Sequence, residues 1–437
     1  MAATLHAIFT QFNQGGENQK ELEQQLIAFK KSDCWDICAE VLSDVDISNA
    51  LPTKLFCASC CSSFVENYWI SLNLDRKNTI RSFLWNFVRN RVSGQNSVAA
   101  PLFSMIVKVL VEIVERDWPD IDSSLFTNLF ELISISCPSF TNPSESVQQI
   151  SIQSITQNPD AIFVSLAIFS CLLQDLGDVR LQGKMTSDRR QRMLQFLIEG
   201  EARLQFDKMI EFVKIVLDGY VQTMRSTVTL QHPFVPSFVT FFPRNESQIV
   251  GMAPQQSIHL RLLRICTDIL DASTKIISPI TTTNNQLILL AITSAIPLIA
   301  LVSEEDVYEW NKTLEEVNEQ NMNESEGGEM NNNNEQDNRQ LISDVDGVCC
   351  GVFELLCSIV SRSCITEYWG LFIQPFVSFI TQHAHRLQSS YMNRSLHIIQ
   401  EFFENQLFIQ VEHAESVVYI ANEVLPRITE LASRFAG

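Results

Sequence analysis

Residues 56–68 read FCASCCSSFVENY, and this stretch indicates the fold of the chain. Its apolar residues recur every three or four positions, and at about 100° per residue they fall within one half of a helical surface. They are Phe56, Cys57, Cys60, Cys61, Phe64, Val65 and Tyr68. The pattern predicts an amphipathic α-helix with one buried side.

The segments that follow show the same periodicity. Asn73 and Asp75 are typical of a helix start, and the next helix is expected to carry one apolar stripe. The stripe consists of Ile80, Phe83, Leu84, Phe87 and Val88. Residues 100–114 are apolar nearly all round, which predicts a helix packed between two neighbours. Pro119 is expected to end that helix and to open the next one, over residues 121–133.

The whole chain continues in this way, and we count about fifteen helical segments of this type, with no competing strand pattern. Helix pairs recur at roughly 40 residues without a strict signature, which is typical of degenerate HEAT or armadillo repeats. The predicted fold class is therefore all-α, an α-solenoid superhelix of antiparallel helix pairs. A globular helical bundle is the alternative, although one compact core becomes awkward beyond about 250–300 residues.

Two segments interrupt the helices. Residues 230–256 carry four prolines and four phenylalanines, which predicts a crossover loop. Its phenylalanines either pack back onto the repeats or form a docking strip. Residues 304–346 hold 14 acidic residues against Lys312 and Arg339, so 12 of the 20 net negative charges lie there. We expect repeats over 1–302, a disordered acidic insert over 303–347, and further repeats over 348–437.

The acidic insert has two interpretations. It is either a solvated insertion between repeats or a loop that contacts a basic patch on a partner, where clustered like charge speeds encounter. The candidate partner-binding residues are Glu304, Glu305, Asp306, Glu315 and Glu316.

Composition excludes several classes of protein. The chain has 437 residues, 46% of them hydrophobic, and a net charge of −20, which opposes binding to a nucleic-acid backbone. Arg189, Arg190 and Arg192 are expected to form only a solvated helix face.

The amino terminus lacks a signal-sequence pattern, which predicts a location in the cytoplasm or nucleus and cysteines in the reduced state. The apolar run 287–302 includes Thr293, Ser294 and Pro297 and is interpreted as a buried helix without membrane insertion.

Motifs for chemistry are sparse. Cys57 and Cys60 have the spacing of a zinc half-site, and Cys34, Cys38 and Cys61 lie nearby in sequence. Because no second C-x-x-C or H-x-x-x-H half-site accompanies them, we interpret them as core residues. The pairs Cys349–Cys350 and His383–His385 are isolated, and no nucleotide-binding or catalytic motif is found. We therefore expect no enzyme activity, no cofactor and no metal.

Three motifs occur in an order found in a known family. They are FVENYW at 64–69, IRSFL at 80–84, and DWP at 117–119. On these residues the region of about 20–135 resembles the amino-terminal region of the importin-β/exportin (karyopherin-β) superfamily. With the following FTNLFELI at 126–133, it is most similar to the exportin-6 branch. Trp69, Asp117, Trp118 and Pro119 are expected to serve structure, because Trp118 buries a large ring at a helix corner.

This resemblance implies a function. Members of the superfamily are non-enzymatic transport receptors that shuttle between nucleus and cytoplasm, contact nuclear pore proteins, and bind Ran-GTP with a protein cargo. In the branch named above the cargo is actin with profilin. Such exportins are about twice as long as this chain or longer, so we expect an amino-terminal portion, a short isoform or an incomplete gene model. The rival hypothesis is a generic cytosolic α-solenoid scaffold for protein complexes.

Overall fold

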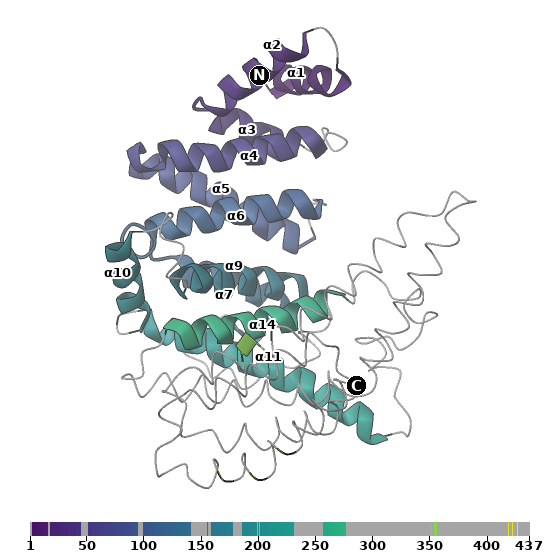
Figure 1. The fold of residues 1–437 in the computed structure, drawn as a ribbon, viewed down its shortest axis with the longest axis vertical. Coiled ribbons are helices and arrows are strands. Elements are labelled where there is room, and N and C mark those ends of the chain that lie inside the picture. Colours follow the sequence, from purple (N-terminus) through teal and green to yellow (C-terminus); the bar gives the residue numbers. More distant parts are fainter. Residues whose placement is uncertain are drawn as a thin grey trace, which may run out of the picture. The chain divides into compact units, whose positions relative to one another are not determined.

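All regular secondary structure in the described part of the chain is helical. The computed structural model describes, besides a few isolated positions, residues 2–15, 18–44, 51–94, 99–140, 159–177, 186–198, 202–230 and 257–276. These residues form eleven α-helices and two 3-10 helices, with no strand among them (Figure 1). The all-α fold class is therefore confirmed for the described ranges. The chain divides into two compact units.

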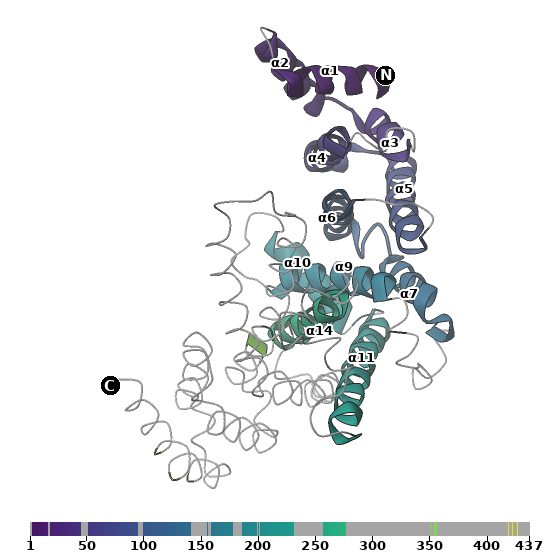
Figure 2. The same ribbon diagram turned by 90° about the vertical axis from the view of Figure 1, so that its right-hand side faces the viewer.

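The first unit comprises Met1–Ile135 and Gln182–Arg189. Its helices are α1 (Ala2–Gln14), α2 (Gln19–Lys30), α3 (Trp35–Ser43), α4 (Leu51–Tyr68), η1 (Trp69–Ser71), α5 (Leu74–Val92), α6 (Ala100–Asp117), α7 (Leu125–Ser136) and the start of α10 (Ser187–Ile198). Helix α4 packs against both α3 and α6, and α6 also packs against α5. Figure 2 shows α4 and α6 in one row and α3 and α5 in the row beside it.

The stretch 56–68 lies in α4 and buries the predicted side. Cys57, Cys60, Cys61, Phe64 and Val65 are fully buried, whereas Phe56 and Tyr68 are half-buried. The Phe64 ring lies 5.7 Å from that of Trp35 on α3 and 5.4 Å from that of Tyr68. The prediction of an amphipathic helix is confirmed.

Helix α5 begins as predicted but buries more than its apolar stripe. Asn73 is the N-cap, and its side-chain oxygen accepts a hydrogen bond of 2.8 Å from the Arg76 N–H. Lys77 and Arg81 are buried with the stripe, which the apolar pattern did not predict.

The prediction that Pro119 opens the next helix is wrong. Helix α6 ends at Asp117, and α7 begins only at Leu125. The N–H groups of Ile121 and Asp122 both donate to the Asp117 carbonyl, which closes a turn instead of starting a helix. The Asp122 carboxylate then accepts from the Ser124 N–H at 3.0 Å, an arrangement that competes with helical hydrogen bonding.

The second unit comprises Ser136–Leu181 and Arg190–Gly437. Its described helices are η2 (Pro138–Phe140), α9 (Pro159–Gly177), most of α10, α11 (Arg203–Leu230) and α14 (Ser257–Ile276). Helix α9 packs along α14 (Figure 1). It is long and apolar enough to cross a membrane, yet 61% of its most apolar window is buried inside the protein, as is typical of a core helix. The run 287–302 lies outside the described residues.

Asp268 on α14 makes the stability of this unit depend on pH. Burial raises the pKa of Asp268 from 3.8 to about 6, although Arg264 Nε, 2.8 Å from its carboxylate, opposes the shift. Because the folded pKa is the higher one, the proton stabilises the fold below about pH 4, and this stabilisation is lost as pH rises through about 6.

Asp268→Asn is therefore expected to remove this pH dependence. The free energy of unfolding at pH 8 should rise by roughly 1–3 kcal/mol, because the neutral amide has no buried charge to desolvate. Urea titrations between pH 4 and 8 measure it. Asp271→Asn on the same helix is the matched control and should give no gain, because it breaks the pair with Lys275. A loss of stability in Asp268→Asn at pH 8 would contradict the prediction.

Candidate functional site

A buried charge cluster surrounds Asp117, the last residue of α6. Asp117 is only 1% exposed to solvent. Its carboxylate accepts hydrogen bonds of 2.8 Å from Trp69 Nε1–H and 2.8 Å from Arg81 Nη1–H. Lys77 Nζ lies 3.6 Å from the same carboxylate and 5.4 Å from the centre of the Trp69 ring. One carboxylate thus serves three donors from two other segments.

Local sequence places these donors. Lys77 and Arg81 are four residues apart, so they lie on the same face of α5. Trp69 lies in the 3-10 turn between α4 and α5. The cluster therefore joins the ends of three consecutive helices, and Trp69 and Asp117, predicted as structural residues, are brought together. Sequence reasoning missed Lys77 and Arg81. Two charged residues four positions apart beside an apolar stripe are a signal of buried charge.

The end of α6 beyond Asp117 is capped by a distant arginine. Arg189 on α10 donates from Nε to the Glu115 carbonyl at 2.7 Å and from Nη2 to the Trp118 carbonyl at 2.9 Å. These carbonyls lack helical partners, so the guanidinium satisfies them. Trp118 is buried as predicted, with its ring edge-on to Phe126 at 6.1 Å, and the Trp118–Pro119 peptide bond is cis. Arg189 is half-buried, not solvated as expected.

A polar groove of about 260 Å³ opens beside this cluster, within the first unit. Asn78, Ser82 and Asn86 form its exposed lip along α5. Asp122 and Asn128 line the opposite wall. Because residues four apart share one face of a helix, this lip could have been found in the sequence as the polar face opposite the apolar stripe.

Two arginines in the groove are held in place by its other side chains. Arg89 Nη2 donates to Asn128 Oδ1 at 2.6 Å and also contacts Glu131. Arg81 Nε lies 3.6 Å from Asp122 Oδ2. The groove thus presents fixed guanidinium, amide and hydroxyl groups, which can hydrogen-bond the main chain and carboxylates of a protein partner.

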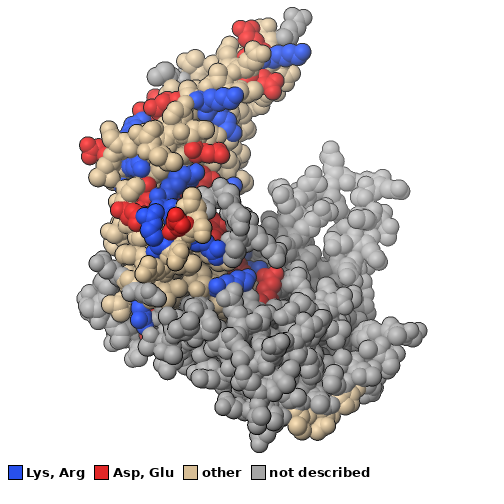
Figure 3. Space-filling model, turned by 60° about the vertical axis from the view of Figure 1, so that its left-hand side comes forward, with Lys and Arg blue, Asp and Glu red and all other residues tan. Residues whose placement is uncertain are grey.

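Charges of both signs lie on the surface of the described residues. Figure 3 shows, on one face, Lys and Arg side chains interspersed with Asp and Glu. The acidic candidates Glu304, Glu305, Asp306, Glu315 and Glu316 lie outside the described residues, as do residues 231–256 and the pairs at 349–350 and 383–385. The structure therefore brings together Trp69, Asp117 and Trp118 but does not place the predicted partner-binding residues.

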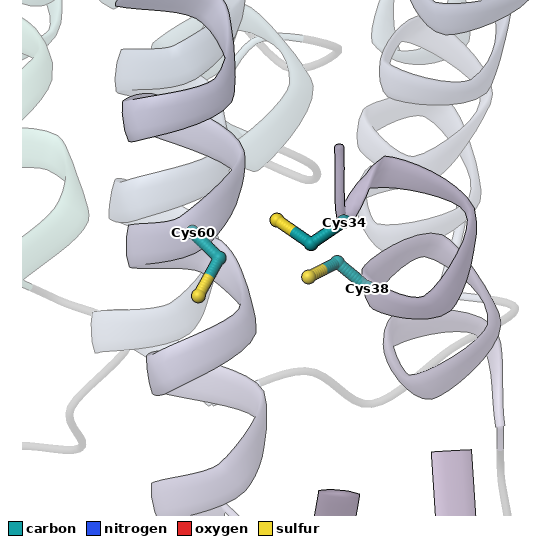
Figure 4. A group of neighbouring side chains, drawn as sticks. All are labelled: Cys34, Cys38 and Cys60. Carbon is teal, nitrogen blue, oxygen red and sulfur yellow. The ribbon is translucent and has the colours of Figure 1, made fainter. Parts of the chain in front are cut away.

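The cysteines predicted to lie in the core do so, in one group. Cys34 and Cys38 on the α3 side face Cys60 on α4 (Figure 4), and their three sulfurs lie within 4.8 Å of one another. Hydrogen bonds from Cys38 and Cys60 lower the pKa of Cys34 to about 4. By contrast, burial alone raises the pKa of the distant Cys137 to about 11. Within the same group, the hydrogen bonds with Cys34 raise the pKa of Cys38 and of Cys60 above the ordinary value of a thiol.

A comparison of the sequence with family models and with curated proteins found no match.

Proposed function

We propose that this protein is a nuclear transport receptor of the exportin class. In this proposal it is an α-solenoid of HEAT-like pairs that binds Ran-GTP and a protein cargo together, and profilin-bound actin is the first cargo to test. It shuttles between nucleus and cytoplasm, and it binds no nucleic acid and inserts into no membrane.

The observation that carries the proposal is the cluster at Asp117. Trp69, Arg81 and Asp117 each belong to a different one of the three motifs on which the family resemblance rests. Although 48 and 36 residues separate Trp69 and Arg81 from Asp117, all three meet in hydrogen bonds. The motifs therefore lie in one structural unit, and this supports the proposal. The two rows of helices in the first unit also suit stacked repeats, in which each pair buries its face on the next.

Binding of the two ligands would be coupled by linkage. If Ran-GTP and cargo favour the same curvature of the superhelix, each raises the affinity for the other by an equal factor. Hydrolysis of GTP belongs to Ran in this scheme. On the described part of the chain, we assign the contact with Ran to the polar groove, because the amide and hydroxyl groups of Asn78, Ser82 and Asn86 on its lip are exposed to solvent.

A pull-down tests the proposal. The purified chain is mixed with Ran carrying a non-hydrolysable GTP analogue or GDP, with and without profilin-bound actin. We expect binding to the GTP form only, strengthened by the actin complex. Equal binding of both nucleotide forms would contradict the proposal and favour the generic scaffold, and so would no binding by the folded chain.

Three variants in the same assay locate the contact. Ser82→Glu adds a charge at the groove lip and is expected to weaken Ran-GTP binding by about tenfold. Thr79→Glu adds the same charge at an exposed position of α5 outside the groove and is the matched control. Deletion of 304–346 should slow association if the acidic insert takes part. Equal losses in Ser82→Glu and Thr79→Glu would exclude the groove.

A further inference from the structure

Five buried thiols gather between α3 and α4. Cys34 is the N-cap of α3, and Cys38 lies about one turn further on, while Cys57, Cys60 and Cys61 lie on α4. All five side chains are fully buried and free of disulfides. Each helix thus supplies cysteines at i and i+3 or i+4, so they point to one side. The second half-site that the sequence lacked is Cys34 with Cys38.

The sulfur positions suit a metal ion. In a tetrahedral zinc site, zinc–sulfur bonds of about 2.3 Å place sulfur atoms about 3.8 Å apart. The sulfurs of Cys34, Cys38 and Cys60 already lie within 4.8 Å of one another. In Figure 4 the side chains of Cys34 and Cys38 extend toward the helix that carries Cys60. These three sulfurs need to approach one another by at most about 1 Å to reach that spacing.

Cys57 is the best fourth ligand. It lies three residues before Cys60 on α4, it contacts the Cys38 thiol, and it is close enough to Cys60 to act on it electrostatically. Cys61 also contacts the Cys38 thiol, but it directly follows Cys60 on α4, and neighbouring residues of a helix do not face each other. Cys137, Cys171 and Cys266 belong to no comparable group within the described residues.

We propose that Cys34, Cys38, Cys57 and Cys60 bind one Zn²⁺ ion in a closed tetrahedral site that joins α3 to α4. Four thiolates from two helices leave no open position, which is typical of a structural zinc site. This inference is independent of the proposed function.

Binding has a simple chemical balance. Four S–H groups release four protons to solvent as four S–Zn bonds form, so the site carries a charge of −2. The amino terminus of α3, at Cys34, provides the positive end of a helix dipole beside this charge. Because the unfolded chain does not hold the four thiols together, metal binding also stabilises the first unit.

Metal analysis of the full chain tests the site. The protein is purified with a reductant and its zinc content is measured by mass spectrometry, and cobalt is then exchanged for zinc. We expect one zinc ion per chain and, with cobalt, the absorption bands of tetrahedral thiolate coordination. Cys38→Ala and Cys60→Ala should lose both signals. Cys61→Ala and Cys137→Ala are the matched controls and should keep them.

Two further measurements guard against misfolding of these variants. Cys60→His retains a zinc ligand and should keep the metal that Cys60→Ala loses. A chelator should lower the melting temperature of the wild-type chain. A folded, reduced chain that holds neither zinc nor cobalt would overturn the proposal. It would also be overturned by disulfides among these cysteines with no metal binding after reduction.

Discussion

Replacing Asp117 with alanine is expected to lower the free energy of unfolding by about 3–5 kcal/mol. The change leaves Arg81 and Lys77 buried without their shared carboxylate and removes the acceptor of the Trp69 indole N–H. Denaturant titration followed by circular dichroism measures the loss. Hydrogen exchange should locate it at the ends of α4, α5 and α6.

The control for Asp117 is an exposed ion pair that joins α5 to α3. Arg76 contacts Asp36 at 2.7 Å, but the Asp36 side chain is 75% exposed. Arg76→Ala is expected to cost less than about 1 kcal/mol because water already screens that pair. A similar small loss for Asp117→Ala would show that the buried cluster does not hold the helix ends together. It would also weaken the argument that the three family motifs form one unit.

Replacing Phe206 with alanine is expected to cost about 3–5 kcal/mol in the second unit. Phe206 on α11 is fully buried, and its ring lies 6.0 Å from that of Phe169 on α9. Truncation removes this aromatic contact and leaves a cavity that the packed helices can fill only in part. Thermal and denaturant unfolding measure the change.

Leu204 provides the matched control two residues away. It is also apolar and lies on the same helix, but it is 78% exposed. Leu204→Ala is expected to change stability by less than about 0.5 kcal/mol. If both variants lose the same amount, helix propensity and not burial against α9 sets the stability of α11.

Local features of the fold were predictable because they depend on residues close in sequence. The buried side of α4 and the Asn73 cap follow from helical periodicity and from hydrogen bonds that span three residues. The start of α7 did not follow from Pro119. Its position depends on the turn that closes on the Asp117 carbonyl and on the Asp122 side chain, which a general preference of proline does not describe.

In the candidate sites, too, the residues on one helix could be predicted from the sequence, whereas their partners on other helices could not. Asn78, Ser82 and Asn86 lie four residues apart and could have been recognised as a polar helix face, but the wall opposite them comes from residues of another helix and its preceding turn. Likewise, Cys57 and Cys60 were visible as half of a metal site, whereas the position of Cys34 and Cys38 was not. The acidic insert stays a prediction from composition alone.

The sequence by itself determined that the described chain is helical, which sides of α4 and α5 carry the apolar stripes, and that α6 is apolar nearly all round. These properties arise from backbone geometry and from hydrophobic spacing over a few turns. Only the tertiary structure decided that the Asp117 carboxylate accepts hydrogen bonds from Trp69 and Arg81 and that the sulfurs of Cys34, Cys38 and Cys60 lie together. Such contacts join residues tens of positions apart, and their partners are selected by how whole helices pack.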